Sequence, residues 1–294
     1  MLDLYLLRYF IAVVESGSFT KAAGQVSVTQ PTLSAGIKKL EEQVGQRLFD
    51  RSQRKRIFLT KAGSVLLPRA KAILHECNMV REDLADAEPA LVIRLGVLTT
   101  IPAMIVSSIL SLVRHKLPRL TIEIQDGSEH ELSNRLDERS IDFALSLDRG
   151  QVVDGQAKAL FEEGYRFVVD NAHPQAQAGV VDGEIFADQN MIVRSRCEVL
   201  SQTSRYFTDR NVRPRLVYRT TNDERALRMV EAGVGATVIP ESYVRDGVAS
   251  VTLKGFDYRR TVALLFPRYQ MPEGLATISD DFVALVQEAM IERT

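Results

Sequence analysis

The sequence has few of the features that mark secreted, membrane-spanning and disulfide-bonded proteins. Its 294 residues include two cysteines, Cys77 and Cys197, which are too few for a disulfide framework. No apolar run approaches the roughly 18 residues that a membrane span requires. The N-terminal segment MLDLYLLRYF carries an early aspartate and no small-residue cleavage site, which argues against a secretion signal. We therefore expect a cytoplasmic protein that has no membrane partner.

Residue patterns typical of enzymes and metal sites are also scarce. The four histidines do not follow metal-ligand spacing, and the sequence alone builds no Ser/His/Asp or paired-carboxylate arrangement. The run Gly233-Val234-Gly235 precedes a strand-like segment, whereas a dinucleotide loop follows a strand and opens a helix. We therefore expect no catalytic residues, no metal and no cofactor.

Charges of the two signs are nearly balanced in number but unevenly distributed. The chain has 37 Lys and Arg against 38 Asp and Glu, so its net charge is −1. Residues 1–65 hold ten Lys and Arg against five Asp and Glu, a net charge of +5, and the remainder therefore carries −6. A basic segment on an acidic protein is expected where one end binds a polyanion. The alternative is a solvated basic surface without a partner.

Apolar residues in the basic segment recur at helical spacing. They predict a first helix that ends near Ser16-Gly17, a second helix over about residues 19–25 that Ser18 caps, and a third helix. Thr29 is a good N-cap for the third helix. Pro31 falls in the first turn of that helix, where the missing N–H has no intrahelical partner. The segment therefore predicts a helix-turn-helix.

The third helix has an apolar side and a polar side. Leu33, Ile37 and Leu40 share one side when residues are placed at about 100° intervals, and we expect them to face the core. Short polar side chains and lysines opposite them suit a major groove, where Gln and Ser read base edges and Lys reaches phosphate or guanine. An ordinary surface helix is the alternative. The candidate DNA-binding residues here are Thr29, Gln30, Pro31, Thr32, Ser34, Ala35, Lys38 and Lys39.

Two short strand-like runs follow this helix, at residues 47–49 and 57–59. The segment between them predicts a winged hairpin beside the recognition helix. Cations at its tip would bind phosphates and give salt-dependent affinity without reading the sequence. The candidate phosphate-binding residues of this wing are Arg51, Arg54, Lys55 and Arg56.

The helix-turn-helix, the run TQPTLSAGIKKLEEQVGQRLFDR and the following IFLTKAG resemble the N-terminal domain of LysR-type transcriptional regulators. Later segments resemble the effector domain of that family, so the resemblance covers most of the chain. Members often carry Arg and Gln where this chain has Ala35 and Gly36, which weakens any transfer of base contacts to these two positions. Gln30, Thr32 and Ser34 are then the stronger candidates for choosing the DNA sequence.

Residues 60–87 predict one long helix that Thr60 caps. Its apolar residues alternate steps of four and three, which is typical of a coiled-coil seam. The resemblance implies that this linker helix pairs with its twin in a homodimer, alone or within a dimer of dimers. A two-fold protein would favour a palindromic operator. The predicted seam residues are Leu66, Ala70, Ile73, Cys77, Val80 and Leu84.

Beyond Pro89, short apolar runs alternate with helical stretches, which indicates an α/β fold with a largely parallel sheet. The resemblance implies two lobes joined by two crossover strands, as in periplasmic solute-binding proteins, with the last helix returning to the first lobe. We therefore expect an all-α winged helix-turn-helix head (1–60), a linker helix (61–89) and an α/β effector-binding body (90–294). Within the body, lobe I takes residues 90–162 and 267–294, and lobe II takes residues 163–266.

Ligands of such sheets are expected at the carboxyl ends of the strands. Thr100 lies at a strand end before a helix that Pro102 starts, where free N–H groups and the helix dipole favour an anion. Thr100 could instead be only an N-cap. Arg194 of lobe II is a candidate carboxylate partner or part of a surface ion pair. The candidate effector-binding residues are Thr99, Thr100, Ile101, Ser128, Val193, Arg194, Thr221 and Asn222.

Together these features favour a ligand-responsive transcription regulator. Its expected partners are a double-stranded DNA operator, a small anionic metabolite and further copies of itself. An enzyme with a DNA-binding head and a solute-binding protein are alternatives. A thiol redox sensor is another, because Cys197 lies in a region where peroxide-sensing members hold a reactive cysteine. Arg194 and Arg196 would lower its pKa, although no second cysteine lies nearby.

Overall fold

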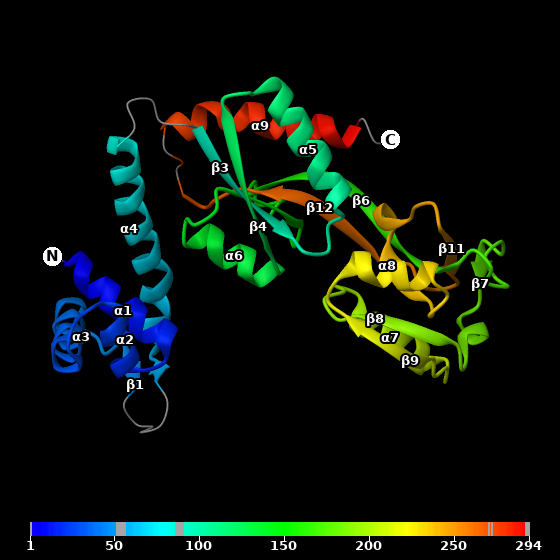
Figure 1. Ribbon diagram of the computed structural model, residues 1–294, viewed down its shortest axis with the longest axis horizontal. Helices are drawn as coiled ribbons and strands as arrows, with labels where there is room; N and C mark the ends of the chain where they lie inside the picture. Colours follow the sequence, from blue (N-terminus) through cyan, green and yellow to red (C-terminus); the bar gives the residue numbers. More distant parts are fainter. Residues whose placement is uncertain (1, 51–56, 86–90, 270, 272, 292–294) are drawn as a thin grey trace.

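The computed structural model describes residues 2–50, 57–85, 91–269, 271 and 273–291. Figure 1 shows a small helical head at one end, the long helix α4 beside it, and a body of two lobes that extends away from them. The expected winged helix-turn-helix head, linker helix and two-lobed α/β body are therefore confirmed. No helix within the described residues is long and apolar enough to span a membrane.

The head consists of three helices and a two-stranded hairpin. Ser18 and Thr29 cap the second and third helices, as predicted, because their hydroxyls accept hydrogen bonds from the backbone N–H of Lys21 and Thr32. Left-handed Gly45 ends the third helix. The elements of the head are α1 (Leu4–Ser16), α2 (Phe19–Gln25), α3 (Gln30–Val44), β1 (Phe49–Asp50) and β2 (Phe58–Leu59), with β1 antiparallel to β2.

Helix α4 (Lys61–Ala85) follows Thr60, whose hydroxyl accepts a hydrogen bond from the N–H of Gly63 as a helix cap does. The predicted seam is wrong in its first half. Ala70 is fully buried and packs with Leu66 in the core of the head, because α4 uses that side to cover its own domain. Among the described side chains of α4, the large apolar residues Val65, Ile73 and Val80 are exposed, with exposed fractions of 63%, 37% and 54%. We call these three residues the α4 stripe.

Ion pairs connect α4 to both the head and the body. The ammonium group of Lys71 lies 3.6 Å from a carboxylate oxygen of Glu15 in α1 and 3.3 Å from one of Glu138 in the body. The Arg139 guanidinium contacts the Glu76 carboxylate of α4 at 2.8 Å and lies over the ring of Tyr269. We call these contacts the head–body joint.

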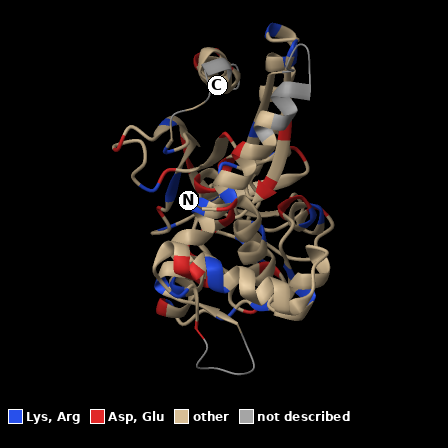
Figure 2. Ribbon diagram, turned by 90° about the vertical axis from the view of Figure 1, so that its left-hand side faces the viewer, with Lys and Arg blue, Asp and Glu red and all other residues tan. Residues whose placement is uncertain are grey.

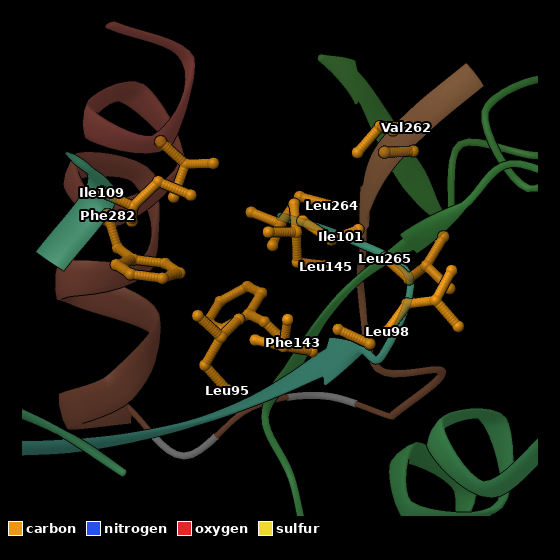
Figure 3. Packing of buried hydrophobic residues seen from close by; sticks show 14 of the residues in the cluster. Leu95, Leu98, Ile101, Ile109, Phe143, Leu145, Val262, Leu264, Leu265 and Phe282 are labelled. Atoms are coloured by element: carbon orange, nitrogen blue, oxygen red, sulfur yellow. The ribbon is translucent and has the colours of Figure 1, made fainter. Parts of the chain in front are cut away.

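Lobe I has strands at its centre and helices on its faces. The first three strands, β3, β4 and β5, are parallel, and α9 returns from the end of the chain to pack against α5 and β3, as expected. Figure 3 shows the side chains of this core, which include the neighbouring rings of Phe143 and Phe282. The elements are β3 (Leu91–Leu98), α5 (Ala103–Lys116), β4 (Leu120–Gly127), α6 (Glu129–Asp137), β5 (Phe143–Leu147) and α9 (Glu273–Ile291).

Lobe II contains the helices α7 and α8, a parallel pair of strands formed by β8 and β9, and further short strands that extend the main sheet. The run VASVTL forms its strand β11. The elements are β7 (Val180–Val181), η1 (Gly183–Phe186), β8 (Asn190–Arg194), α7 (Leu200–Asp209), β9 (Arg215–Thr220), α8 (Asp223–Glu231), β10 (Thr237–Pro240), η2 (Glu241–Tyr243) and β11 (Val248–Leu253).

Two crossover strands, β6 (Ala157–Asp170) and β12 (Arg259–Leu265), join the lobes. The first half of β6 pairs with β12, and its second half pairs with β10 and β11. All of these pairings are antiparallel, and β12 also runs antiparallel to β5. The expectation of a largely parallel sheet is therefore wrong. The sheet is mixed, because each crossover strand enters a lobe against the direction of its neighbours.

Candidate functional site

The outer side of α3 carries most of the candidate DNA-binding residues. Its buried residues, which include Leu33, Ile37 and Leu40, face the core of the head as predicted. The hydroxyls of Thr29 and Thr32 are 2.8 Å apart, and the side-chain oxygen of Gln30 accepts a hydrogen bond from Thr20. Ser34 is half-buried. The exposed candidates on α3 and its cap are Thr29, Gln30, Pro31, Thr32, Ala35, Lys38 and Lys39.

Gly36 does not belong to this outer side. A Cβ atom at Gly36 would lie 2.6 Å from a ring carbon of Tyr9 in α1, which is closer than real Cβ contacts allow. The position is buried where α1 and α3 cross. A glycine there therefore allows close helix packing, and the difference from LysR-type regulators noted at Gly36 concerns packing more than base contacts.

The two lysines of α3 have different surroundings. Lys38 is exposed and lies 3.7 Å from the Glu42 carboxylate one turn away, a surface pair of small energy. Lys39 donates hydrogen bonds of 2.8 Å to Asp3 and 3.1 Å to the Tyr5 hydroxyl, both near the start of α1. The bond to Asp3 raises the pKa of Lys39 and lowers that of Asp3. The Lys39 charge is therefore partly used inside the head.

Figure 2, which faces the head, shows Lys and Arg interspersed with Asp and Glu over its helices. The four cations expected at the tip of the wing, Arg51, Arg54, Lys55 and Arg56, lie outside the described residues. The strands β1 and β2 that border them pair as an antiparallel hairpin, as a wing requires.

Between the lobes, Thr100 is 2% exposed and lies at the centre of a buried polar cluster. The N-cap of α5 is Pro102, so Thr100 is not the cap of that helix. Its hydroxyl donates a hydrogen bond to Oε1 of Glu198, from the loop between β8 and α7 in lobe II. Both the hydroxyl and the carbonyl oxygen of Thr100 accept hydrogen bonds from Arg260 on β12, at 3.3 and 3.1 Å. This cluster links both lobes with a crossover strand.

The Arg260 guanidinium holds two carboxylates. It contacts Oε1 of Glu198 at 2.9 Å and Oε1 of Glu163 at 2.8 Å. The Tyr165 hydroxyl donates to Oε2 of Glu198 at 3.1 Å, and burial together with the Glu198 charge raises the pKa of Tyr165. Burial alone would lower the pKa of Arg260, but the charges of Glu163 and Glu198 outweigh burial and raise it. The two carboxylates therefore stabilise the charged form of the Arg260 guanidinium.

Arg194 is not placed to bind an effector, nor is it in a surface ion pair. Its side chain is 1% exposed and forms a two-pronged pair with Asp223, whose side chain is 3% exposed. Its remaining Nη1 donates to the carbonyl oxygen of Val238 at 3.0 Å. Because β8 and α8 are thereby tied together inside lobe II, Arg194 is a structural residue of that lobe.

Most other candidate effector residues also have local roles. Ser128 forms a capping box with Glu131 at the start of α6. The Asn222 side chain caps α8, and Thr221 is exposed beside it. Figure 3 labels Ile101 among the packed side chains of the lobe I core. Among the described residues, Thr100 is the only one of the eight candidates whose side chain forms a hydrogen bond with the opposite lobe.

Two further features lie close to this cluster. The Thr99 hydroxyl is buried and has no hydrogen-bond partner within the described residues. A cavity of about 670 Å³ lies in lobe II against α7, β8 and β9, and Val193, Cys197 and Phe207 are among its lining residues. Burial raises the pKa of the Cys197 thiol, and the positive charge of Arg194 offsets this only in part. No group of metal-ligating side chains was found in the described part of the chain.

The sequence did not point to Glu198, Arg260, Tyr165 or Glu163. One usable signal was the position of Arg260 directly before the apolar run TVALL of β12, because a charged side chain in a buried strand needs a partner. Nothing local identifies that partner. Glu198 lies 62 residues from Arg260 along the chain.

Comparison with known proteins agrees with this architecture. Residues 4–64 match the family model described as bacterial regulatory helix-turn-helix protein, lysR family, and residues 86–289 match the LysR substrate binding domain. The hydrogen peroxide-inducible genes activator of Dickeya chrysanthemi is 26% identical over 271 residues, which cover 88% of each protein.

Solved structures of similar fold span nearly the whole chain. A full-length OxyR variant from Pseudomonas aeruginosa has a TM-score of 0.60 at 22% identity and covers 99% of this chain and 98% of its own. Full-length CbnR in complex with its target DNA has a TM-score of 0.61 at 20% identity and covers 98% of this chain and 100% of its own. With both family models matched in order along one chain, the protein belongs to the LysR family and is a LysR-type DNA-binding transcriptional regulator.

Proposed function

We propose that the outer side of α3 enters the major groove of an operator and that the body controls this binding in response to a small molecule held between its lobes. One observation carries the proposal. The first turns of α3 expose mainly short polar side chains, and Lys38 follows on the same outer side, whereas the apolar residues of the helix are buried in the head. Such a helix fits the groove without steric obstruction.

Within this proposal the residues divide into two groups. Gln30, Thr32 and Ser34 contact base edges, because their hydroxyl and amide groups offer the donors and acceptors that direct readout uses. Lys38 and the wing cations contact phosphates and supply affinity. Lys39 contributes less, since its ammonium group is already bonded to Asp3.

We further propose that two copies pair through the α4 stripe. Val65, Ile73 and Val80 lie about two turns apart, and all three remain exposed in the single chain. Pairing would bury them and place two heads about a two-fold axis, so that the operator contains two inverted half-sites.

The proposal excludes catalysis and places the protein in the cytoplasm with the DNA it regulates. A thiol redox sensor receives less support, although several relatives are named hydrogen peroxide-inducible activators. A reactive thiol is commonly a thiolate of low pKa, whereas burial raises the pKa of Cys197. The other cysteine, Cys77, lies on α4 and not in lobe II.

DNA binding by the full-length protein tests the proposal. Operator fragments selected from a random double-stranded library are labelled, and their anisotropy is measured with increasing protein between 50 and 200 mM KCl. We expect affinity for selected DNA to exceed that for scrambled DNA and to fall steeply with salt. Equal affinity for both DNAs, or affinity that does not change with salt, would contradict the proposal.

Two neighbouring lysines provide a matched pair for the same assay. Replacing Lys38 by alanine should weaken binding to all DNA sequences and reduce the salt slope by about one. Replacing Lys39 by alanine should change the slope less, because its ammonium group is bonded to Asp3 within the head. Equal changes in slope for the two variants would show that the Asp3 contact does not limit Lys39.

A further inference from the structure

The contact between the lobes contains a carboxylate that the protein itself supplies. The Glu198 side chain is 5% exposed, and both of its oxygens are bonded. Oε1 accepts from the Thr100 hydroxyl and from Arg260, and Oε2 accepts from the Tyr165 hydroxyl. The donors come from lobe I and from both crossover strands, whereas the acceptor comes from lobe II.

These donors are the groups that would bind the carboxylate of a small molecule. A guanidinium and two hydroxyls around one carboxylate form charge-assisted hydrogen bonds that favour an anion in a buried place. The groups are already assembled, because Arg260 is held by Glu163 and by the carbonyl oxygen of Thr100 as well. The cluster is therefore a carboxylate subsite with an occupant.

Charge excludes the simple addition of a second anion. Arg260, Glu163 and Glu198 together carry a net charge of −1, and the side chains of all three are at most 5% exposed. An extra carboxylate would be a buried charge without a partner, which is strongly unfavourable. A ligand carboxylate can enter only if the Glu198 carboxylate leaves.

We propose that Glu198 is an internal occupant of the effector site, and that a monocarboxylate effector acts by replacing it on Thr100, Tyr165 and Arg260. This inference rests on the proposed role of the body as an effector domain. Replacement removes the hydrogen bond from lobe I to the β8–α7 loop and frees that loop of lobe II. The effector then shifts the equilibrium toward the state in which Glu198 is released. The size of the shift is set by how much more favourably the effector carboxylate binds the subsite than the Glu198 carboxylate does.

The buried Thr99 hydroxyl supports this assignment. It lies next to Thr100 at the end of β3 and has no partner within the described residues. A buried hydroxyl without a hydrogen bond is energetically unfavourable. A ligand oxygen within reach could accept a hydrogen bond from the Thr99 hydroxyl, a donor that Glu198 does not use.

Rescue by a small carboxylate tests the proposal directly. Full-length Glu198→Ala leaves the subsite empty, and sodium acetate is titrated into it with sodium chloride at equal ionic strength as the reference. We expect acetate to raise the Tm of this variant by about 2 °C or more in a saturable manner. The wild-type protein should respond to acetate no more than to chloride.

Glu162→Ala is the matched control. It removes a glutamate from the same strand that carries Tyr165, but its side chain is 54% exposed and pairs with exposed Arg259. Acetate should not stabilise this variant beyond chloride. If acetate stabilises Glu198→Ala and Glu162→Ala equally, the proposal is wrong.

A second variant keeps the test decisive if the alanine variant does not fold. Glu198→Gln preserves the size of the side chain and removes its charge, so the Arg260 cluster becomes neutral. Acetate should then bind at least about tenfold more tightly than to wild type, measured by calorimetry. Equal affinity for the two proteins would overturn the proposal. Neither measurement involves DNA, so a failure of operator binding would refute the proposed function and leave the occupant role of Glu198 standing.

Discussion

The buried pair of Arg194 and Asp223 gives the sharpest test of how lobe II is held together. Arg194→Met keeps the length of the side chain and removes the charge, leaving Asp223 buried with a side chain that is 3% exposed. Removing one partner of a buried ion pair typically costs 3–5 kcal/mol, because the other charge loses its compensation. The Val238 carbonyl also loses a donor, worth about 1 kcal/mol. We expect lobe II to be less stable by about 4 kcal/mol.

Hydrogen exchange of the full-length protein, followed by mass spectrometry, measures this change in lobe II alone. The chain has several domains, so one global unfolding transition cannot be assumed. Peptides from β8 and α8 should exchange far faster in Arg194→Met, whereas peptides from the head should be unchanged. Arg196→Met, an exposed arginine two residues away, should alter exchange by less than about 0.5 kcal/mol.

A double variant separates the charge from the shape of the site. Arg194→Met combined with Asp223→Leu removes both charges, and apolar replacement of a complete buried pair is often close to neutral. The double variant should therefore recover most of the lost stability. The reasoning is refuted if Arg194→Met alone lies within about 1 kcal/mol of wild type, since Arg194 would then be available for a ligand.

Three further predictions concern packing, a thiol and a buried carboxyl group. Gly36→Ala should lower DNA affinity and head stability by about 1–2 kcal/mol, because its Cβ would lie 2.6 Å from the Tyr9 ring in α1. Gly24 has open space around it, so Gly24→Ala should instead stabilise the head by about 0.5–1 kcal/mol, measured by hydrogen exchange. Cys197 should react with iodoacetamide at pH 7 more slowly than a free cysteine, followed by peptide mass spectrometry; a faster reaction would restore the redox sensor. Burial raises the pKa of Asp142 above its ordinary value, so the free energy of unfolding should fall as the pH rises through the raised pKa. Asp142→Asn should lose this fall when urea unfolding is followed from acidic to neutral pH, and an unchanged profile would argue against it.

The head was predictable because its signals are local. Thr29, Pro31 and the spacing of Leu33, Ile37 and Leu40 lie within twelve residues and determine both the start of α3 and its buried side. The same sequence could not show that Gly36 faces α1, since that depends on the crossing of two helices. Nor could the heptad spacing of α4 show that Ala70 packs within its own head, because apolar spacing does not identify the partner surface.

The inter-lobe cluster was less predictable because its members are distant in sequence. Thr100 was identified from its strand end, but its partner Glu198 is 98 residues further along, and Arg260 comes from the crossover strand β12. Arg194 and Asn222 have side chains suited to binding a ligand, but Arg194 pairs with Asp223 inside lobe II and Asn222 caps α8. A charged or polar residue at a strand end can cap a helix or pair inside one lobe as readily as it can face a ligand, and only the fold distinguishes these cases.

The head–body joint bears on how salt titrations of DNA binding should be interpreted. Lys71 shares its ammonium group between Glu15 and Glu138, and Arg139 pairs with Glu76, with side chains that are between 18% and 57% exposed. Mobile ions weaken such exposed pairs over the same concentration range that displaces counterions from DNA. A salt slope measured on the full-length regulator would then combine phosphate contacts with the release of the head from the body. Lys71→Met combined with Arg139→Met removes the ion pairs of the joint and touches no proposed DNA contact, so it provides the reference slope that separates the two contributions.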